Sequence, residues 1–144
     1  MSIETWKQEF YAVEAGVLNS AADVVALRHS VKKWEGLRPG NLERHGLKVS
    51  SKHGRSRIQG VKGANFYIDS ASCALCSKYL FFSRDDDGCG NCPLSKIRGN
   101  VVCDVDVDGD DISPFKAWRR GADPEPMLHW LRKALKVAML KEGK

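Results

Sequence analysis

Residues 73–103 read CALCSKYLFFSRDDDGCGNCPLSKIRGNVVC and contain all five cysteines of the chain. Cys73 and Cys76 form one CxxC pair, Cys89 and Cys92 form a second pair, and Cys103 follows after ten further residues. The residues around the cysteines are rich in Gly, Asn, Pro and Asp, which is typical of loops that need a cross-link rather than an apolar core. The cysteine pattern therefore decides how the middle of the chain folds.

The spacing of the two CxxC pairs is typical of a structural zinc site. A CxxC turn points two thiolates at one ion while its backbone amides donate to the sulfur atoms, and two such turns complete a tetrahedron. Gly90 permits the tight backbone of the second turn, and Pro93 stiffens its exit. We expect the zinc ligands to be Cys73, Cys76, Cys89 and Cys92, with Cys103 as an alternative or additional ligand.

Three other interpretations of the cysteines stay open. Disulfide bonds conflict with the odd number of cysteines and with the N-terminal sequence MSIETWKQEF, which lacks the pattern of an export signal. Free buried cysteines are ordinary in cytosolic proteins, but they rarely occur as two CxxC pairs. An iron–sulfur cluster could use four of the five thiolates, although the spacing matches neither common ferredoxin pattern.

Helices are predicted on both sides of the cysteines. Apolar residues recur at helical spacing over residues 4–18 and 21–34, which predicts a helical hairpin within residues 1–40. The clearest helix spans residues 123–142, where Asp123 is a good N-cap and an apolar stripe runs beside a basic C-terminal half. The expected core residues are Trp6, Phe10, Trp34, Leu128, Leu131 and Leu135.

Residues 44–68 form a basic stretch without any acidic residue. Weak alternation of apolar and polar residues predicts a β-hairpin or an exposed basic loop, and residues 65–69 predict one more short strand. The bases that could contact nucleic-acid phosphates here are Arg44, Lys48, Lys52, Arg55, Arg57 and Lys62.

These segments predict an α+β fold in a single domain over residues 1–144. A helical hairpin (1–40) and a C-terminal amphipathic helix (123–142) would pack with a small β element (44–68) and a cysteine-bound zinc knuckle (69–118). The length of 144 residues and a hydrophobic content of 42% suit one globular domain. No apolar run approaches the roughly 18 residues that a membrane span needs, so we expect a cytoplasmic protein without a membrane partner.

The formal net charge of +5 is unevenly distributed. Residues 69–111 hold nine acidic and four basic residues, a net charge of −5, which leaves +10 for the rest of the chain. The basic parts suit nucleic acid or an acidic protein, and an ordinary solvated surface is the plain alternative. The sequence DVDVDG at 104–109 begins like an EF-hand loop, but Phe115 stands where the calcium-binding Glu belongs.

The chain contains no recognisable catalytic motif of the serine hydrolase, zinc protease, P-loop or dinucleotide-binding type. A zinc ion with four thiolate ligands also leaves no open position for a substrate. We therefore expect a protein that is not an enzyme, in which His29, His45, His53 and His129 are surface or packing residues. A small metal-dependent nuclease with His45 or His53 as its base is a further alternative.

The motifs CALC at 73–76, CGNCP at 89–93, Cys103 and SPF at 113–115 resemble those of small uncharacterised phage and prophage proteins. Those proteins carry a CxLC…CxxCP…C…(S/T)P(Y/F) pattern, and the helix end over residues 26–35 is similar to theirs as well. The Asp-rich residues after Cys103 and the basic stretch before Cys73 depart from that pattern. The resemblance implies a phage origin and a cysteine-bound metal with Cys103 among its ligands.

The expected function is that of a zinc-stabilised interaction protein. It would bind and modulate a host protein, for example a component of host defence, in the host cytoplasm. The alternative is a zinc-containing nucleic-acid-binding protein that uses the basic segment 44–62. An affinity that falls steeply with salt would favour the nucleic-acid alternative, because phosphate contacts release counterions.

Overall fold

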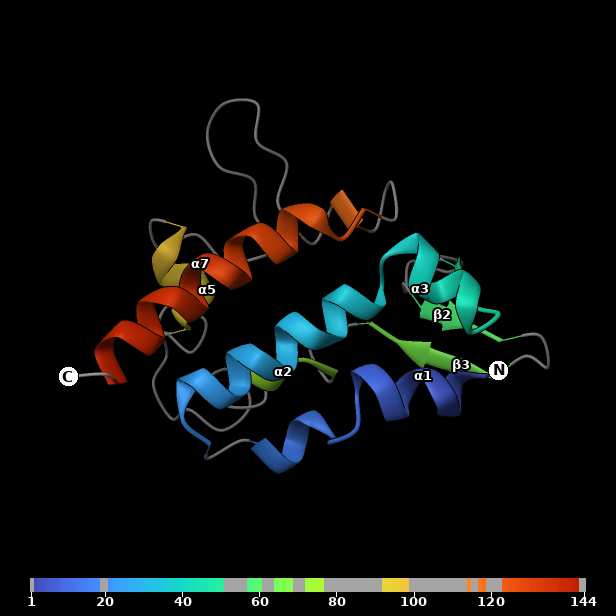
Figure 1. The fold of residues 1–144 in the computed structure, drawn as a ribbon, viewed down its shortest axis with the longest axis horizontal. Helices are drawn as coiled ribbons and strands as arrows, with labels where there is room; N and C mark the ends of the chain where they lie inside the picture. The colour runs from blue at the N-terminus through green and yellow to red at the C-terminus, as the bar shows by residue number, and fades with distance from the viewer. Residues whose placement is uncertain are drawn as a thin grey trace.

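The computed structural model shows a helix-rich protein with one small antiparallel sheet, which confirms the expected α+β class (Figure 1). The structure describes residues 2–18, 21–50, 57–60, 64–68, 72–76, 92–98, 114, 117–118 and 123–142. Its helices are α1 (Ile3–Phe10), the 3-10 helix η1 (Ala15–Leu18), α2 (Asp23–Gly36), α3 (Pro39–Arg44), α4 (Ala74–Cys76), α5 (Pro93–Ile97) and α7 (Glu125–Glu142). Its strands are β1 (Lys48–Ser50), β2 (Arg57–Gln59) and β3 (Asn65–Tyr67).

The N-terminal segment is two short helices instead of the single helix predicted over residues 4–18. Helix α1 starts with a capping box, in which the Ser2 hydroxyl accepts the Thr5 N–H and the Thr5 hydroxyl accepts the Ser2 N–H. The helix stops at Tyr11, whose backbone is no longer helical and whose hydroxyl accepts the Ala15 N–H at 3.0 Å. The side chain of Tyr11 thus holds the turn that leads into η1.

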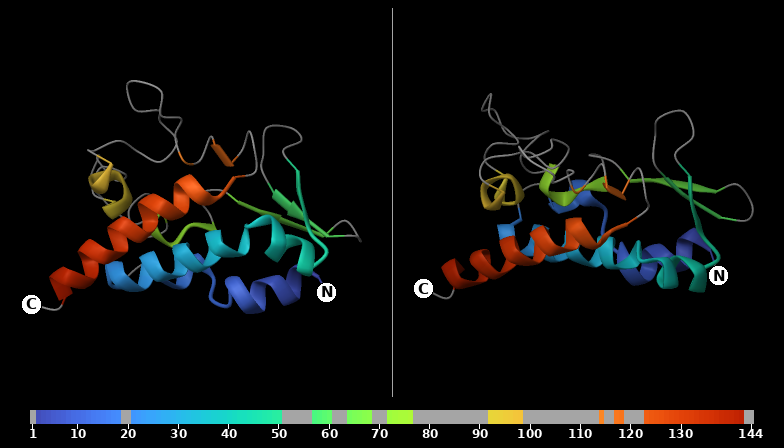
Figure 2. Two further views of the ribbon diagram at one scale, coloured as in Figure 1. Left: turned by 45° about the horizontal axis from the view of Figure 1, so that its top comes forward. Right: turned by 90° about the horizontal axis from the view of Figure 1, so that it is seen from above.

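Helices α2 and α7 pack side by side and antiparallel, with α1 on the other side of α2 (Figure 1, Figure 2). The predicted cap of α7 is confirmed, because Asp123 Oδ1 accepts the Glu125 N–H at 3.0 Å. Two ion pairs mark the antiparallel alignment: Arg38 Nε lies 2.7 Å from Glu125 Oε1, and an Arg132 nitrogen lies 3.6 Å from a Glu35 oxygen.

The sheet has the strand order β1-β2-β3, and both pairings are antiparallel. The hairpin predicted in the basic stretch is confirmed, with Val49 opposite Ile58, and β3 adds the expected third strand with Phe66 opposite Ile58. Ile58 is fully buried, and the Phe66 ring centroid lies 5.6 Å from that of Trp6. The sheet therefore covers the α1 end of the helical layer (Figure 2).

The core confirms most of the predicted set. Trp6, Phe10, Trp34, Leu128 and Leu131 are buried, whereas Leu135 is half-buried at the margin of the core. Burying each such apolar side chain favours folding by about 1.5–3 kcal/mol. The core thus joins α1, α2 and α7 into one packed layer.

Candidate functional site

The two cysteines whose side chains the structure describes each stand directly before a short helix. Cys73 precedes α4 and Cys92 precedes α5, and both are half-buried, unbridged thiols packed against the core. Cys76 ends α4, but its side chain is outside the described part of the structure, as are Cys89 and Cys103 altogether. The predicted set of zinc ligands therefore lies largely outside the described residues.

The short helices attach these cysteines to different long helices. Helix α4 packs against α2 and η1, whereas α5 packs against α7 (Figure 1). The first turn of α5 is closed by a hydrogen bond of 3.0 Å from the Lys96 N–H to the Cys92 carbonyl. Each described cysteine thus stands at the start of a short helical turn.

Lys33 is a buried lysine that reaches the residue before Cys73. Its side chain lies on α2, is 1% exposed, and donates from Nζ to the Ser72 carbonyl at 3.1 Å. The Ser72 hydroxyl lies 3.5 Å from the same nitrogen. A buried ammonium group is costly unless it is hydrogen-bonded and balanced by negative charge. Lys33 therefore places a positive charge next to the turn that starts at Cys73.

His29 stands one helical turn before Lys33 on α2 and contacts Tyr11 and Val13, in the segment before η1. Its Nε2 atom is 2.6 Å from the Val13 carbonyl oxygen, and its ring centroid is 4.8 Å from that of Tyr11. A carbonyl can only accept, so Nε2 carries the proton and Nδ1 carries the lone pair. Nδ1 is buried and has no hydrogen-bond partner among the described residues.

The surroundings of His29 favour its neutral form. Burial lowers the pKa of His29 below its ordinary value, and the Lys33 ammonium acts in the same direction. The hydrogen bond to the Val13 carbonyl, and the nearby Cys73 and Glu14, oppose this shift of the pKa. A neutral imidazole with a free lone pair is the form that binds a metal.

From the sequence, His29 is expected to be a surface or packing residue, and its hydrogen bond to Val13 was not predicted. One signal was present, because His29 and Lys33 are four residues apart and must share one face of a helix. That this face meets Ser72 and Cys73 could not be predicted, since about 40 residues separate the two segments. Among the described residues alone, no three His, Cys, Asp or Glu side chains gather around a metal position.

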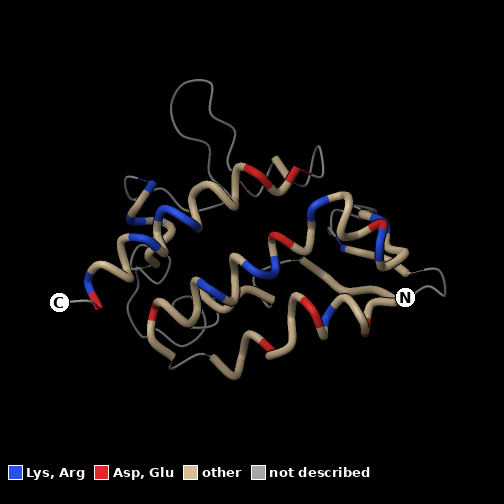
Figure 3. The backbone as a smooth tube through the Cα atoms, in the orientation of Figure 1, with Lys and Arg blue, Asp and Glu red and all other residues tan. Residues whose placement is uncertain are grey.

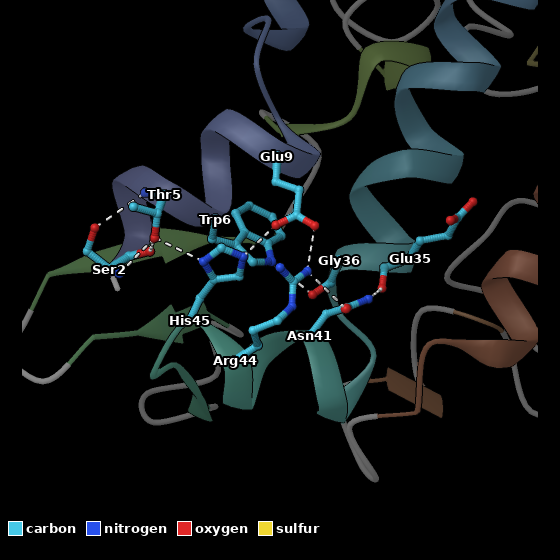
Figure 4. Close-up of polar contacts among 9 residues, drawn as sticks. All are labelled: Ser2, Thr5, Trp6, Glu9, Glu35, Gly36, Asn41, Arg44 and His45. Atoms are coloured by element: carbon cyan, nitrogen blue, oxygen red, sulfur yellow. Dashed lines mark hydrogen bonds and ion pairs between the residues drawn. The ribbon is translucent and has the colours of Figure 1, made fainter.

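A second polar cluster joins α1 to α3 through His45 (Figure 4). His45 is buried, with Nδ1 at 2.9 Å from Thr5 Oγ1 and Nε2 at 2.8 Å from Glu9 Oε2. Arg44 donates to the other Glu9 oxygen at 2.5 Å. Hydrogen bonds from Arg44 and then from His45 hold the pKa of Glu9 below its ordinary value.

This cluster brings together a hydroxyl, an imidazole and a carboxylate, and it links α1 to the end of α3. The Thr5 hydroxyl already accepts the Ser2 N–H at 2.9 Å and lies 2.9 Å from the Ser2 carbonyl, as the capping of α1 requires. Both ring nitrogens of His45 have partners within the fold. The other histidine considered as the base of the alternative nuclease, His53, lies outside the described residues.

Segment 44–62 was predicted to contact nucleic acid. Among the described residues of this segment, few bases are available for contacts with phosphates. Arg44 is paired with Glu9, and the Nε atom of Arg57 is buried within the structure. Lys48 is exposed on β1, and Lys52, Arg55 and Lys62 are outside the described residues.

Exposed bases instead gather along α2 and α7 (Figure 3). We call this set the basic seam, and its members are Arg28, Lys32, Arg132, Lys133 and Lys136. Arg132 on α7 forms an ion pair with Glu35 on α2. Lys32 stands one helical turn before Glu35, and Lys136 stands one helical turn after Arg132. Because the two helices are antiparallel, both lysines lie on the same side of this ion pair. No carboxylate of the described chain pairs with Arg28, Lys32 or Lys136.

None of the known protein families, curated proteins or solved structures matches this chain. In the described part of the structure, no helix is both long enough and apolar enough to cross a bilayer.

Proposed function

We propose that this protein is a non-catalytic binding protein with a zinc-stapled cysteine segment, and that its basic seam contacts an acidic surface of a host protein. One observation carries the proposal. The two described cysteines start helices that pack on α2 and on α7, respectively, and these are the two helices that present the basic seam. A zinc ion that joins the two CxxC turns would therefore link α2 and α7 through α4 and α5.

The residues around Cys73 suit a thiolate-bound metal. Lys33 supplies a buried positive charge beside the first CxxC turn, and His29 leaves a buried lone pair without a partner there. Unsatisfied buried polar atoms are uncommon in native proteins and often mark the place of an ion or a water molecule. Zinc bound by thiolates would supply folding energy to a segment whose composition suits a loop.

A host protein as the partner is supported by the resemblance of the cysteine motif to small phage proteins, and the host cytoplasm is then the place of action. The charge of the basic seam supports an acidic partner, because complementary charge steers association and fixes its register. A modulator that works by binding needs no catalytic group, and the sequence carries no recognisable catalytic motif.

The experiment compares the wild-type protein with the double variant Lys32→Glu/Lys136→Glu in capture from a nuclease-treated host lysate. Lys48→Glu is the matched control, because Lys48 is also an exposed base and lies on β1, outside the basic seam. We expect one acidic host protein to be retained by the wild type and the control and lost by the double variant. Retention of the same proteins by all three would contradict the proposal.

Nucleic-acid binding is the second candidate, and the basic seam favours it for the same reason. If it holds, the affinity for a labelled DNA oligonucleotide falls steeply with salt, and the double variant lowers the slope of the salt dependence by about two, or one per lysine removed. A salt-independent affinity, or no binding at low salt, would eliminate this candidate and leave the protein partner.

A further inference from the structure

We propose that the last turns of α7 form the contact between two copies of this chain, which associate about a two-fold axis into a dimer. A groove with a volume of about 550 Å³ lies where α5 and the start of α2 flank the C-terminal half of α7 (Figure 1). None of the bases of the basic seam lines this groove. The contact is therefore distinct from the surface that we propose for the host protein.

The groove has apolar walls with small side chains on α7. Ala134 and Ala138 stand one helical turn apart, and Val137 shares their face of the helix. The apolar residues that line the groove are Val24, Pro93, Ile97, Ala134, Val137 and Ala138. A hollow of this kind accepts a larger apolar side chain from a facing helix, as a hole accepts a knob in a coiled coil.

Large apolar side chains are exposed beside the groove. Val137 is 40% exposed and Leu140 is 63% exposed, and the two are neighbours on one face of α7. Helix α7 extends past the start of α2, so α2 does not cover its last turn (Figure 2). Leu140 does not line the groove of its own chain. In a two-fold contact, Leu140 of each copy enters the groove of the other copy, and apolar surface that a single copy exposes is covered.

The charges at the groove favour a second copy over other occupants. Two acids and two bases line it, so its formal charge is zero, and these residues are Asp23, Glu142, Lys96 and Lys141. An acidic protein or an anionic amphiphile would meet both acids as well as both bases. A two-fold axis instead lets the bases of one copy face the acids of the other, because each contact occurs twice in reverse order. The lining is thus complementary in charge to itself.

The test is sedimentation equilibrium of the intact chain over a range of concentrations. We expect the wild type to shift from the monomer mass of 16.0 kDa to twice that mass. Leu140→Glu should raise the dissociation constant of the dimer by about tenfold or more, because it places a charge in the apolar contact. Met139→Glu is the matched control, since Met139 is also exposed, at 47%, and its side chain leaves the helix about 100° away from that of Leu140.

An exchange of charges tests the two-fold arrangement separately. Lys141→Glu leaves one base against three acids in each groove, and we expect the dissociation constant to rise by about threefold or more. Adding Glu142→Lys returns the lining to zero charge and should restore the wild-type value. Both residues are exposed, so the fold tolerates the exchange. Circular dichroism of each variant confirms that its helices are retained.

Two outcomes would overturn the proposed dimer. The first is a wild-type chain that stays monomeric up to millimolar concentration, whether or not an amphiphile or a host protein then occupies the groove. The second is a dimer that Leu140→Glu weakens no more than Met139→Glu does, because the contact would then lie elsewhere on the molecule.

Discussion

Trp6 donates its indole N–H to the carbonyl oxygen of Gly36 at a distance of 2.8 Å. This bond joins the middle of α1 to the last residue of α2 inside the core, where Trp6 is fully buried. The close approach depends on Gly36 having no side chain, because a Cβ there would lie 2.7 Å from Phe10 Cβ. The contact between α1 and α2 is therefore set by one glycine and the two aromatic residues that surround it.

Gly36→Ala should destabilise the protein by about 1–3 kcal/mol, because the added methyl group overpacks the contact with Phe10. Gly40→Ala is the matched control, since a Cβ at Gly40 meets nothing within 4 Å and its effect should stay within about 0.5 kcal/mol. Urea denaturation of both variants measures the difference. Equal midpoints for the two variants would contradict the packing described for Gly36.

Lys33→Met should destabilise the fold by about 1–3 kcal/mol, because it removes the hydrogen bond from the Lys33 ammonium to the buried Ser72 carbonyl. Lys32→Met is the control, since Lys32 is the exposed neighbour and its replacement should change stability by no more than about 0.5 kcal/mol. The free energy of unfolding is measured with and without zinc. If Lys33 balances the charge of the metal centre, its loss also weakens zinc retention, which Lys32→Met leaves unchanged.

Cys76→Ser should release the zinc and loosen the region of about residues 70–118, because a structural zinc site supplies the folding energy of its loops. The measurement is zinc content together with the rate of trypsin cleavage at Lys78 and Arg84. Ser77→Ala changes the neighbouring residue without removing a sulfur atom, and it should keep about one zinc per chain. A Cys76→Ser protein with full zinc content and unchanged cleavage would contradict the site.

Glu9 should contribute stability at neutral pH that disappears in acid. Its pKa in the folded state is lowered, chiefly by Arg44 and then by His45, so the unfolded chain takes up the proton first. The contribution is present above the unfolded pKa near 4.5 and is lost as the pH falls through the lower folded value. Urea midpoints of the wild type and Glu9→Gln should therefore differ at pH 7 and converge toward pH 3. A difference that is constant over this range would rule out the linkage.

Local signals in the sequence predicted the elements that depend on neighbours along the chain. Asp123 caps α7 as its position predicted, and the alternation around Ile58 gave the hairpin of β1 and β2. The end of α1 was not predictable in this way. The Tyr11 hydroxyl must find the Ala15 N–H before the turn exists, and no helix-breaking residue stands at that point.

Of the residues in the candidate site, the sequence predicted only the cysteines. Lys33 reads as an ordinary surface base on α2, because its partner Ser72 is 39 residues away in the chain. His29 reads as a packing residue for the same reason. Helical periodicity can show which residues share a face, but what that face meets is decided by tertiary packing.

Helix α2 packs against α1, η1, α3, α4 and α7, so most helices of the described structure rest directly on it. An element shared in this way prevents the two sides of the protein from melting independently. Damage at the aromatic contact around Gly36 and damage at the corner of His29 and Lys33 should thus appear in the same cooperative transition. Hydrogen exchange in the middle of α2 would then report the global unfolding of the chain, whichever side is perturbed.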